Sequence, residues 1–113
     1  EVFRDMEEDD FMIMSRNVVM YHHERFDGTG YPYGLKGEEI PLEARIIGIA
    51  DAFDAMTANR VYRRQLDLDF VISELKRCSG TQFDPKLVEI LLSLIEDGTI
   101  DVQRLYEKSK EDR

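Results

Sequence analysis

Glycine and proline recur through residues 26–41, and this recurrence constrains the fold more than any other feature of the sequence. The residues are Gly28, Gly30, Pro32, Gly34, Gly37 and Pro41. Because such a density forbids regular structure, the sequence predicts a long loop here. Long loops inside small domains tend to carry function. The only two histidines of the chain, His22 and His23, stand directly before this segment.

The segments on either side of the loop show helical periodicity. Apolar spacing predicts helices over residues 11–25, 42–58 and 69–79, and the first of these suits a mostly buried helix. A further helix is predicted from Pro85, with Asp84 as its N-cap and Gly98 after its end, and residues 99–113 form a C-terminal helix or tail. The residues predicted to face the core are Ile46, Ile49, Ala50, Phe53, Met56, Ile72 and Leu75. Since no strand-period alternation occurs, the predicted class is all-α, a helical bundle of about five helices.

Length and composition restrict the kind of protein. A chain of 113 residues suits one compact domain, and its net charge of −9 disfavours non-specific binding to nucleic acid. No apolar run approaches the ~18 residues of a membrane span. The chain opens with Glu1 and shows no secretory leader, which favours a mature product or an excised fragment. Cys78 is the only cysteine, so we expect a small buried hydrophobe in a reducing cytoplasm.

Two pairs of side chains could hold metal ions. On a helix, His22 and His23 would diverge by ~100°, so they could not chelate one ion together. Each could serve a different ion, or one could be a ligand and the other structural; a packed or surface pair is the alternative. Asp51 and Asp54 share one face of the next helix. A buried Asp51 would need a cation or hydrogen-bond donors, whereas a solvent-facing stripe suits Asp54 better.

Further residues could contact a phosphate-bearing ligand. Arg60 and Arg63 carry guanidinium groups that match phosphate oxygens, with a solvated helix end as the alternative. Gly28 and Gly30 would let the backbone approach a ligand, and Tyr31 offers a stacking face. These glycines follow a helix rather than a strand, which excludes a P-loop or a dinucleotide-binding fingerprint.

In their order and spacing, "HHERFDGTGYP", "GLKGEEIPLEARIIGIADAFDAMT", "RVYR" and "GTQFDP" resemble the second half of an HD-GYP domain, over about residues 20–92. The resemblance implies a metal-dependent phosphodiesterase that hydrolyses cyclic di-GMP in bacterial signalling, with two or three iron or manganese ions in an all-helical bundle. It implies that the metal ligands are His22, His23 and Asp51. It further implies that the residues contacting substrate are Gly28, Gly30, Tyr31, Pro32, Asp54, Arg60 and Arg63.

The histidine–aspartate pair that gives the family its name does not occur in this chain. We therefore expect a single partial domain over residues 1–113, the C-terminal portion of an HD-GYP domain. Alone, it should be hydrolytically inactive and short of metal ligands. The expected partners are cyclic di-GMP, the missing N-terminal half, a second copy, and a diguanylate cyclase or another signalling domain. The second copy would join through apolar stripes that we expect to be exposed on residues 11–20 and 87–95. Two alternatives stay open: a non-catalytic remnant that binds a nucleotide or a partner, and an interaction bundle whose acids and histidines only decorate the surface.

Overall fold

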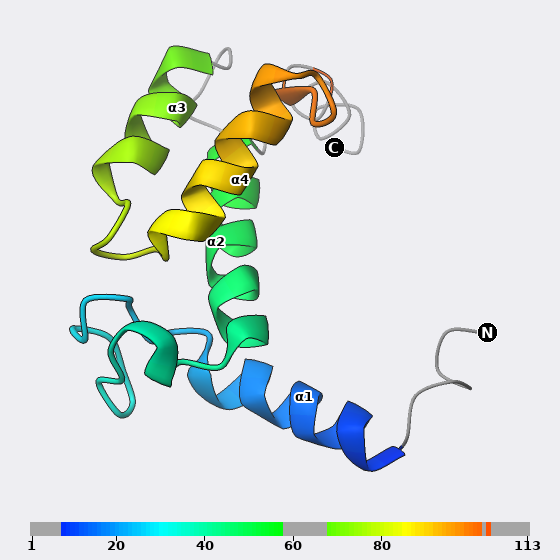
Figure 1. The fold of residues 1–113 in the computed structure, drawn as a ribbon, viewed down its shortest axis with the longest axis vertical. Coiled ribbons are helices and arrows are strands. Elements are labelled where there is room, and N and C mark those ends of the chain that lie inside the picture. Colours follow the sequence, from blue (N-terminus) through cyan, green and yellow to red (C-terminus); the bar gives the residue numbers. More distant parts are fainter. Residues whose placement is uncertain (1–7, 58–67, 103, 105–113) are drawn as a thin grey trace. The chain divides into compact units, whose positions relative to one another are not determined.

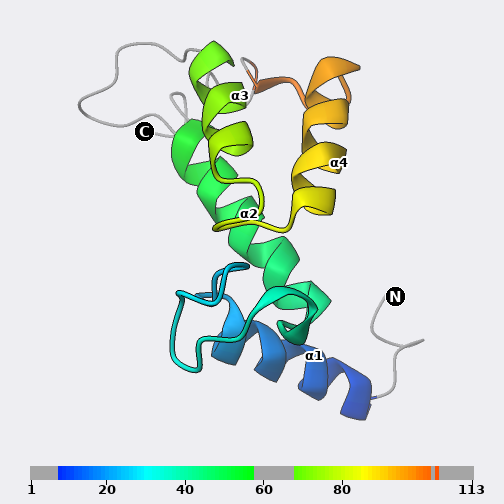
Figure 2. The ribbon, with the colours of Figure 1, turned by 60° about the vertical axis from the view of Figure 1, so that its left-hand side comes forward.

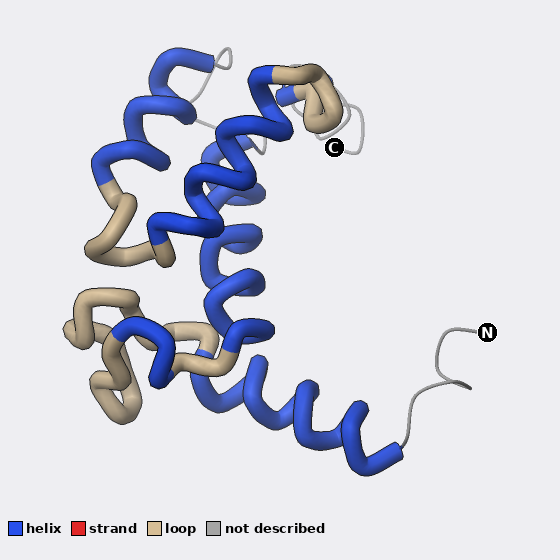
Figure 3. Tube along the Cα trace, in the orientation of Figure 1, coloured by secondary structure: helices blue, strands red, loops and turns tan. Residues whose placement is uncertain are grey.

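The computed structural model describes residues 8–57, 68–102 and 104, and the regular structure in these ranges is helical (Figure 1). The elements are α1 (Glu8–Tyr21), the short 3-10 helix η2 (Gly37–Glu39), α2 (Leu42–Thr57), α3 (Leu68–Arg77) and α4 (Pro85–Glu96). Figure 3 shows helices and loops without a strand in the described part of the chain. The all-α prediction is therefore confirmed, while most of the predicted C-terminal tail lies outside the described residues. No helix in these ranges has both the length and the apolar character needed to cross a bilayer.

The chain divides into two compact units, Glu1–Gly48 and Ile49–Arg113, and the division falls within α2. The single partial domain over residues 1–113 stays a prediction.

The first unit contains α1, the loop and the start of α2. Ile40 and Ala44 are its most buried apolar residues, at 2% and 1% exposure. The Asn17 side-chain amide donates a hydrogen bond to Glu43 Oε2 at 3.1 Å, which ties α1 to the first turn of α2. The pKa of the Glu43 carboxyl is lowered, first by its own backbone N–H and then by this amide.

The apolar residues of α1 are largely exposed. Phe11, Met12, Ile13 and Val19 all lie on the surface, and Val19 reaches 73% exposure. The prediction of a mostly buried first helix is therefore wrong, because no described residue of the first unit covers this side of α1. The apolar stripe expected to be exposed on residues 11–20 is confirmed. The second expected stripe, on residues 87–95, is exposed only in part, since Ile90 is 55% exposed and Val88 is buried.

The second unit is built around α3 and α4, which run side by side in Figures 1 and 2. Its core consists of Ile49, Val71, Leu75, Cys78, Phe83, Val88 and Val102. From α2, Ala52, Phe53 and Met56 pack against this core beside Ile49. Cys78 is buried and free, as expected of a small hydrophobe.

The buried stripe of α2 differs in part from the predicted one. Ile49, Phe53 and Met56 contribute to the core as predicted, but Ile46 and Ala50 are exposed. The stripe runs through positions 49, 52, 53 and 56, and residue 50 lies about 100° away from residue 49 around the helix. In α3, Leu75 is buried as predicted, while Val71 rather than Ile72 is fully enclosed.

The start of α4 follows the sequence prediction. Asp84 accepts a hydrogen bond from the Lys86 backbone N–H at 2.9 Å, and Pro85 occupies the first helical turn. Gly98 has φ of 84°, the left-handed conformation that commonly follows a helix end. These local signals therefore set both ends of α4.

Candidate functional site

The histidine pair lies in a turn that begins where α1 ends at Tyr21. The helix predicted over residues 11–25 extends too far, since the Glu24 backbone N–H already donates to the Tyr21 carbonyl in a tight turn at 3.0 Å. The imidazole rings of His22 and His23 are in contact, with centroids 4.0 Å apart and an interplanar angle of 40°. The prediction that the two rings point apart is therefore wrong, because both residues lie beyond the helix.

The ring of His22 is held by the backbone of α1. Its Nδ1 lies 2.7 Å from the Val18 carbonyl oxygen, which also accepts the His22 backbone N–H at 3.1 Å. Since a carbonyl oxygen can only accept, Nδ1 carries the hydrogen and a neutral ring presents its lone pair at Nε2. Metal-binding histidines commonly donate their other ring N–H in this way. His22 therefore fits a metal ligand acting through Nε2.

The Tyr31 ring stacks on His23. The ring centroids are 5.0 Å apart and the planes differ by 12°. The Tyr31 backbone N–H also approaches the His23 carbonyl at 3.4 Å, and the Tyr31–Pro32 peptide bond is cis. Tyr31 is 62% exposed, so part of its ring surface stays available to a ligand.

Gly30 lets the loop fold back onto the histidine turn. A Cβ at this position would lie 2.3 Å from the Arg25 backbone N and 2.6 Å from the Glu24 Cα and the His23 carbonyl oxygen. No side chain fits in this space, which gives Gly30 a steric role. Gly28 is a glycine for another reason, because its φ of 85° lies in the left-handed region.

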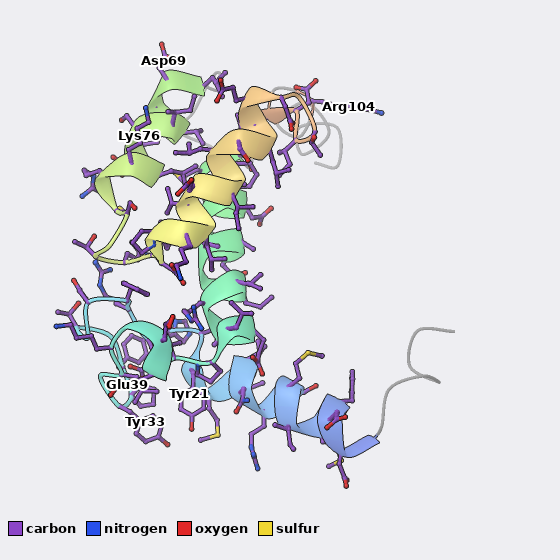
Figure 4. All side chains as sticks on the ribbon, in the orientation of Figure 1. Tyr21, Tyr33, Glu39, Asp69, Lys76 and Arg104 are labelled. Atoms are coloured by element: carbon purple, nitrogen blue, oxygen red, sulfur yellow. The ribbon has the colours of Figure 1, made fainter. Side chains whose placement is uncertain are left out.

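Glu24 is a residue that the sequence reasoning missed. It is only 8% exposed, and its two carboxylate oxygens accept the backbone N–H groups of Tyr33 at 2.7 Å and Leu35 at 2.8 Å. A loop without regular structure has many backbone N–H groups that need acceptors. The acid next to the histidines could therefore have been predicted to accept hydrogen bonds from the loop. Tyr33 also lies next to Tyr21 (Figure 4). The centroids of their two rings are 5.7 Å apart.

Arg25, Asp27 and Thr29 form a cluster of hydrogen bonds at the start of the loop. The Thr29 hydroxyl and backbone N–H both donate to Asp27 Oδ1, and Arg25 Nε donates to the Thr29 hydroxyl at 2.9 Å. These donors, the Thr29 hydroxyl above all, hold the pKa of the Asp27 carboxyl below its usual range. Asp27 also forms an isolated antiparallel bridge with Lys36, and η2 follows. The prediction that residues 26–41 contain no regular structure is therefore wrong in part, because this segment contains the bridge and the short helix η2.

The remaining predicted site residues do not belong to the described residues of the first unit. Asp51 and Asp54 lie on α2 within the second unit, and both side chains are exposed. Arg60 and Arg63 lie outside the described residues. Within the described ranges, no three side chains of His, Cys, Asp or Glu are grouped so that they could hold a metal ion. The structure thus brings together His22, His23, Gly30 and Tyr31, and the joint ligation by His22, His23 and Asp51 stays a prediction.

The second unit also contains a cavity of about 220 Å³. Ala52, Met56, Cys78 and Phe83 contribute to its lining, together with Glu74 and Arg77. Glu74 and Arg77 pair with each other at 2.8 Å, so their charges already have partners. The cavity therefore offers mainly apolar surface, which does not suit a phosphodiester.

Residues 11–87 match the family model of the HD domain. The chain belongs to the HD domain family. Among curated relatives, the cyclic di-GMP phosphodiesterase response regulator RpfG of Xanthomonas campestris is 45% identical over 82 residues, which are 73% of this chain and 22% of the relative. The cyclic di-GMP phosphodiesterase of Thermotoga maritima is 41% identical over 91 residues, or 80% of this chain and 24% of the relative.

A solved structure is similar as well. The crystal structure of a cyclic GMP-AMP-specific phosphodiesterase of Vibrio cholerae, V-cGAP3, matches with a TM-score of 0.58 and 30% identity, covering 74% of this chain and 21% of that chain. Together with the named relatives, this match confirms the HD-GYP resemblance. The chain spans about a fifth of the length of these relatives.

Proposed function

We propose that this chain is the histidine-pair and Gly-Tyr-Pro part of a metal-dependent phosphodiesterase domain, and that the complete domain hydrolyses cyclic di-GMP. The observation that carries the proposal is the His22 ring, whose Nδ1 faces the Val18 carbonyl and leaves Nε2 for a metal ion. Relatives named for cyclic di-GMP support this substrate. Another relative, 43% identical over 81 residues, is named as a 3'3'-cGAMP-specific phosphodiesterase. The dinucleotide 3'3'-cGAMP is therefore the substrate with which cyclic di-GMP should be compared.

The proposed ligands are His22, His23 and Asp51. Imidazole and carboxylate donors suit iron or manganese, which usually take about six ligands each. A bound divalent ion would supply Lewis acidity toward the phosphate oxygens of the substrate. Because three side chains cannot fill such coordination spheres, we expect the remaining ligands to come from the missing N-terminal half of the domain and from water. The chain alone is therefore expected to be inactive.

The proposed substrate contacts follow these ligands in the sequence, one group after the histidines and one after Asp51. The exposed Tyr31 ring offers a face on which a guanine base can stack, next to Gly28, Gly30 and Pro32. Arg60 and Arg63 would pair with phosphate oxygens, and Asp54 would accept hydrogen bonds from a base edge.

The test uses the whole protein that contains this chain, purified with Mn²⁺ and incubated with cyclic di-GMP or 3'3'-cGAMP. We expect cyclic di-GMP to be the better substrate by chromatography, and we expect His22→Ala and His23→Ala to lower both the bound metal and the turnover. Lys76→Ala, an exposed change on α3, serves as the control. Unchanged metal content in both histidine variants would end the proposed ligand roles. Turnover by the 113-residue chain alone would contradict its expected inactivity.

The second candidate function is binding without turnover. It is favoured by the described residues, among which no three potential ligands form a metal-holding group. Calorimetry of the chain with cyclic di-GMP separates the two functions. Binding by the chain together with absent turnover by the whole, metal-loaded protein would favour this candidate.

A further inference from the structure

We propose that Glu24 is a positioning residue that holds the Gly-Tyr-Pro turn so that the Tyr31 ring fixes the orientation of the His23 imidazole. The proposal deepens the proposed function, and it rests on that function only for its effect on metal binding. The orientation of His23 itself can be measured without a metal.

Two hydrogen bonds connect the loop to Glu24. One carboxylate oxygen accepts the Tyr33 N–H at 2.7 Å and the other accepts the Leu35 N–H at 2.8 Å. Hydrogen bonds to an ionised acceptor are stronger than neutral ones. Since Glu24 is 8% exposed, little water competes for these two donors. The carboxylate therefore fixes the backbone just after Tyr31 and Pro32.

The loop also folds back onto the histidine turn. Gly30 packs directly against the backbone of His23, Glu24 and Arg25, as shown by the short distances that a Cβ there would make. The Tyr31 N–H approaches the His23 carbonyl from the same side of the loop. Backbone contacts before Tyr31 and the Glu24 carboxylate after it thus hold this residue from both directions.

The two histidines differ in the contacts that hold their rings. The His22 ring is fixed by its own hydrogen bond to the Val18 carbonyl. Within the described part of the chain, the His23 ring is held instead by contacts with the rings of His22 and Tyr31. The orientation of His23 therefore depends on the loop, whereas that of His22 depends on α1.

The substitution that tests this arrangement is Glu24→Gln. Glutamine keeps the size of the side chain but has one acceptor oxygen and an amide that only donates. Either the Tyr33 or the Leu35 N–H would then face another donor. Glu43→Gln is the matched control in the same unit, because it makes the same charge change at a residue that contacts Asn17 rather than the loop. Tyr31→Leu removes the ring at a 62% exposed position and leaves Glu24 intact.

The first measurement is the NMR chemical shift of the His23 ring protons in the metal-free chain. A tyrosine ring stacked at 5.0 Å shifts these protons through its ring current. We expect Glu24→Gln and Tyr31→Leu to lose this shift and Glu43→Gln to keep it. Circular dichroism of the helices checks that each variant is folded. If Tyr31→Leu, or folded Glu24→Gln, leaves the His23 shifts unchanged, the proposal is overturned.

The second measurement is the affinity of the whole protein for Mn²⁺. We expect Glu24→Gln to weaken Mn²⁺ binding by about 10–100-fold, as is typical when a residue supporting a metal ligand is lost. If the unsubstituted protein binds no Mn²⁺, the proposed function fails, while the ring-current result still decides the role of Glu24. Normal affinity in a Glu24→Gln variant that has lost the His23 shift would overturn the link from loop to metal.

Discussion

At the scale of single residues, Gly30 and Gly98 are both restricted to glycine, for different physical reasons. A Cβ at residue 30 would meet backbone atoms at 2.3–2.6 Å, whereas one at residue 98 would meet nothing within 4 Å. Gly98 is constrained instead by its φ of 84°. The first glycine is thus required by the shape of the loop and the second by its own backbone conformation.

Gly30→Ala is therefore expected to be the more damaging of two alanine substitutions. Backbone atoms cannot move aside cheaply, so we expect a loss of about 3 kcal/mol, near the upper end for overpacking. Gly98→Ala, the matched control, should cost about 1–2 kcal/mol for a left-handed alanine. Urea unfolding followed by circular dichroism measures both. Equal costs would show that the loop can move to admit the methyl group.

The hydrogen bond from Thr29 to Asp27 gives the loop a pH dependence of defined sign. Because the pKa of Asp27 is lowered in the folded chain, its contribution to stability is present above the usual aspartate range and is lost as the pH falls through the lowered value. Thr29→Val removes the hydroxyl and should raise the pKa of Asp27 toward the ordinary ~3.9.

Carbon-13 NMR titration of the Asp27 carboxyl measures this change. Thr29→Ser, which keeps a hydroxyl, should preserve the lowered pKa. An unchanged pKa in Thr29→Val would assign the effect to the backbone N–H and to Arg25 instead.

Sequence reasoning selected the residues of this loop but not their geometry. His22, His23, Gly30 and Tyr31 were all named, since their types point to metal binding and close approach. The contact between the two rings depends on the end of α1, and the end of α1 depends on a loop that folds back from residues 30–35. Glu24 was missed for the same reason, because its partners lie nine and eleven residues further along the chain.

At the scale of secondary-structure elements, helices were predictable where local signals set their ends. α4 begins at Pro85 after the Asp84 N-cap, and α2 begins at Leu42 after Pro41, both as predicted. The last residue of α1 and the short helix η2 were not predictable, because contacts within the folded loop define them.

Asp84 allows a direct measurement of one such signal. Its side chain accepts the Lys86 N–H, so Asp84→Ala should lower the free energy of unfolding by about 1 kcal/mol. Asp84→Asn should stay within a few tenths of the original value, because asparagine caps a helix about as well. Urea unfolding compares the two variants. Equal losses in both would assign the effect to the charge of Asp84 rather than to its capping bond.

At the scale of the whole molecule, the motifs predicted the family, and the match to the HD domain confirmed it. The division of the chain within α2 was not predictable, because it depends on which contacts cluster rather than on any local break in the sequence. The exposed apolar surface of α1 was predicted from the hypothesis that this chain is part of a larger domain, in which other helices would cover it.

That surface is expected to make the chain self-associate. Met12 and Val19 lie two helical turns apart on one side of α1 and are 60% and 73% exposed. Substituting both by lysine should shift the mass measured by sedimentation equilibrium toward that of a monomer. Glu89→Lys, an exposed polar position on α4 where the substitution makes the same total charge change, is the control and should leave association unchanged. A monomeric unsubstituted chain at micromolar concentration would contradict this expectation.

The aromatic contacts of the loop have a practical consequence for spectroscopy. The chain has five tyrosines and no tryptophan, and Tyr21, Tyr31 and Tyr33 take part in the ring contacts described above. Replacing Tyr62 and Tyr106 by phenylalanine would leave these three as its sole strong near-ultraviolet chromophores. Their fluorescence and near-ultraviolet dichroism would then follow the order of the loop, while the far-ultraviolet signal follows the helices.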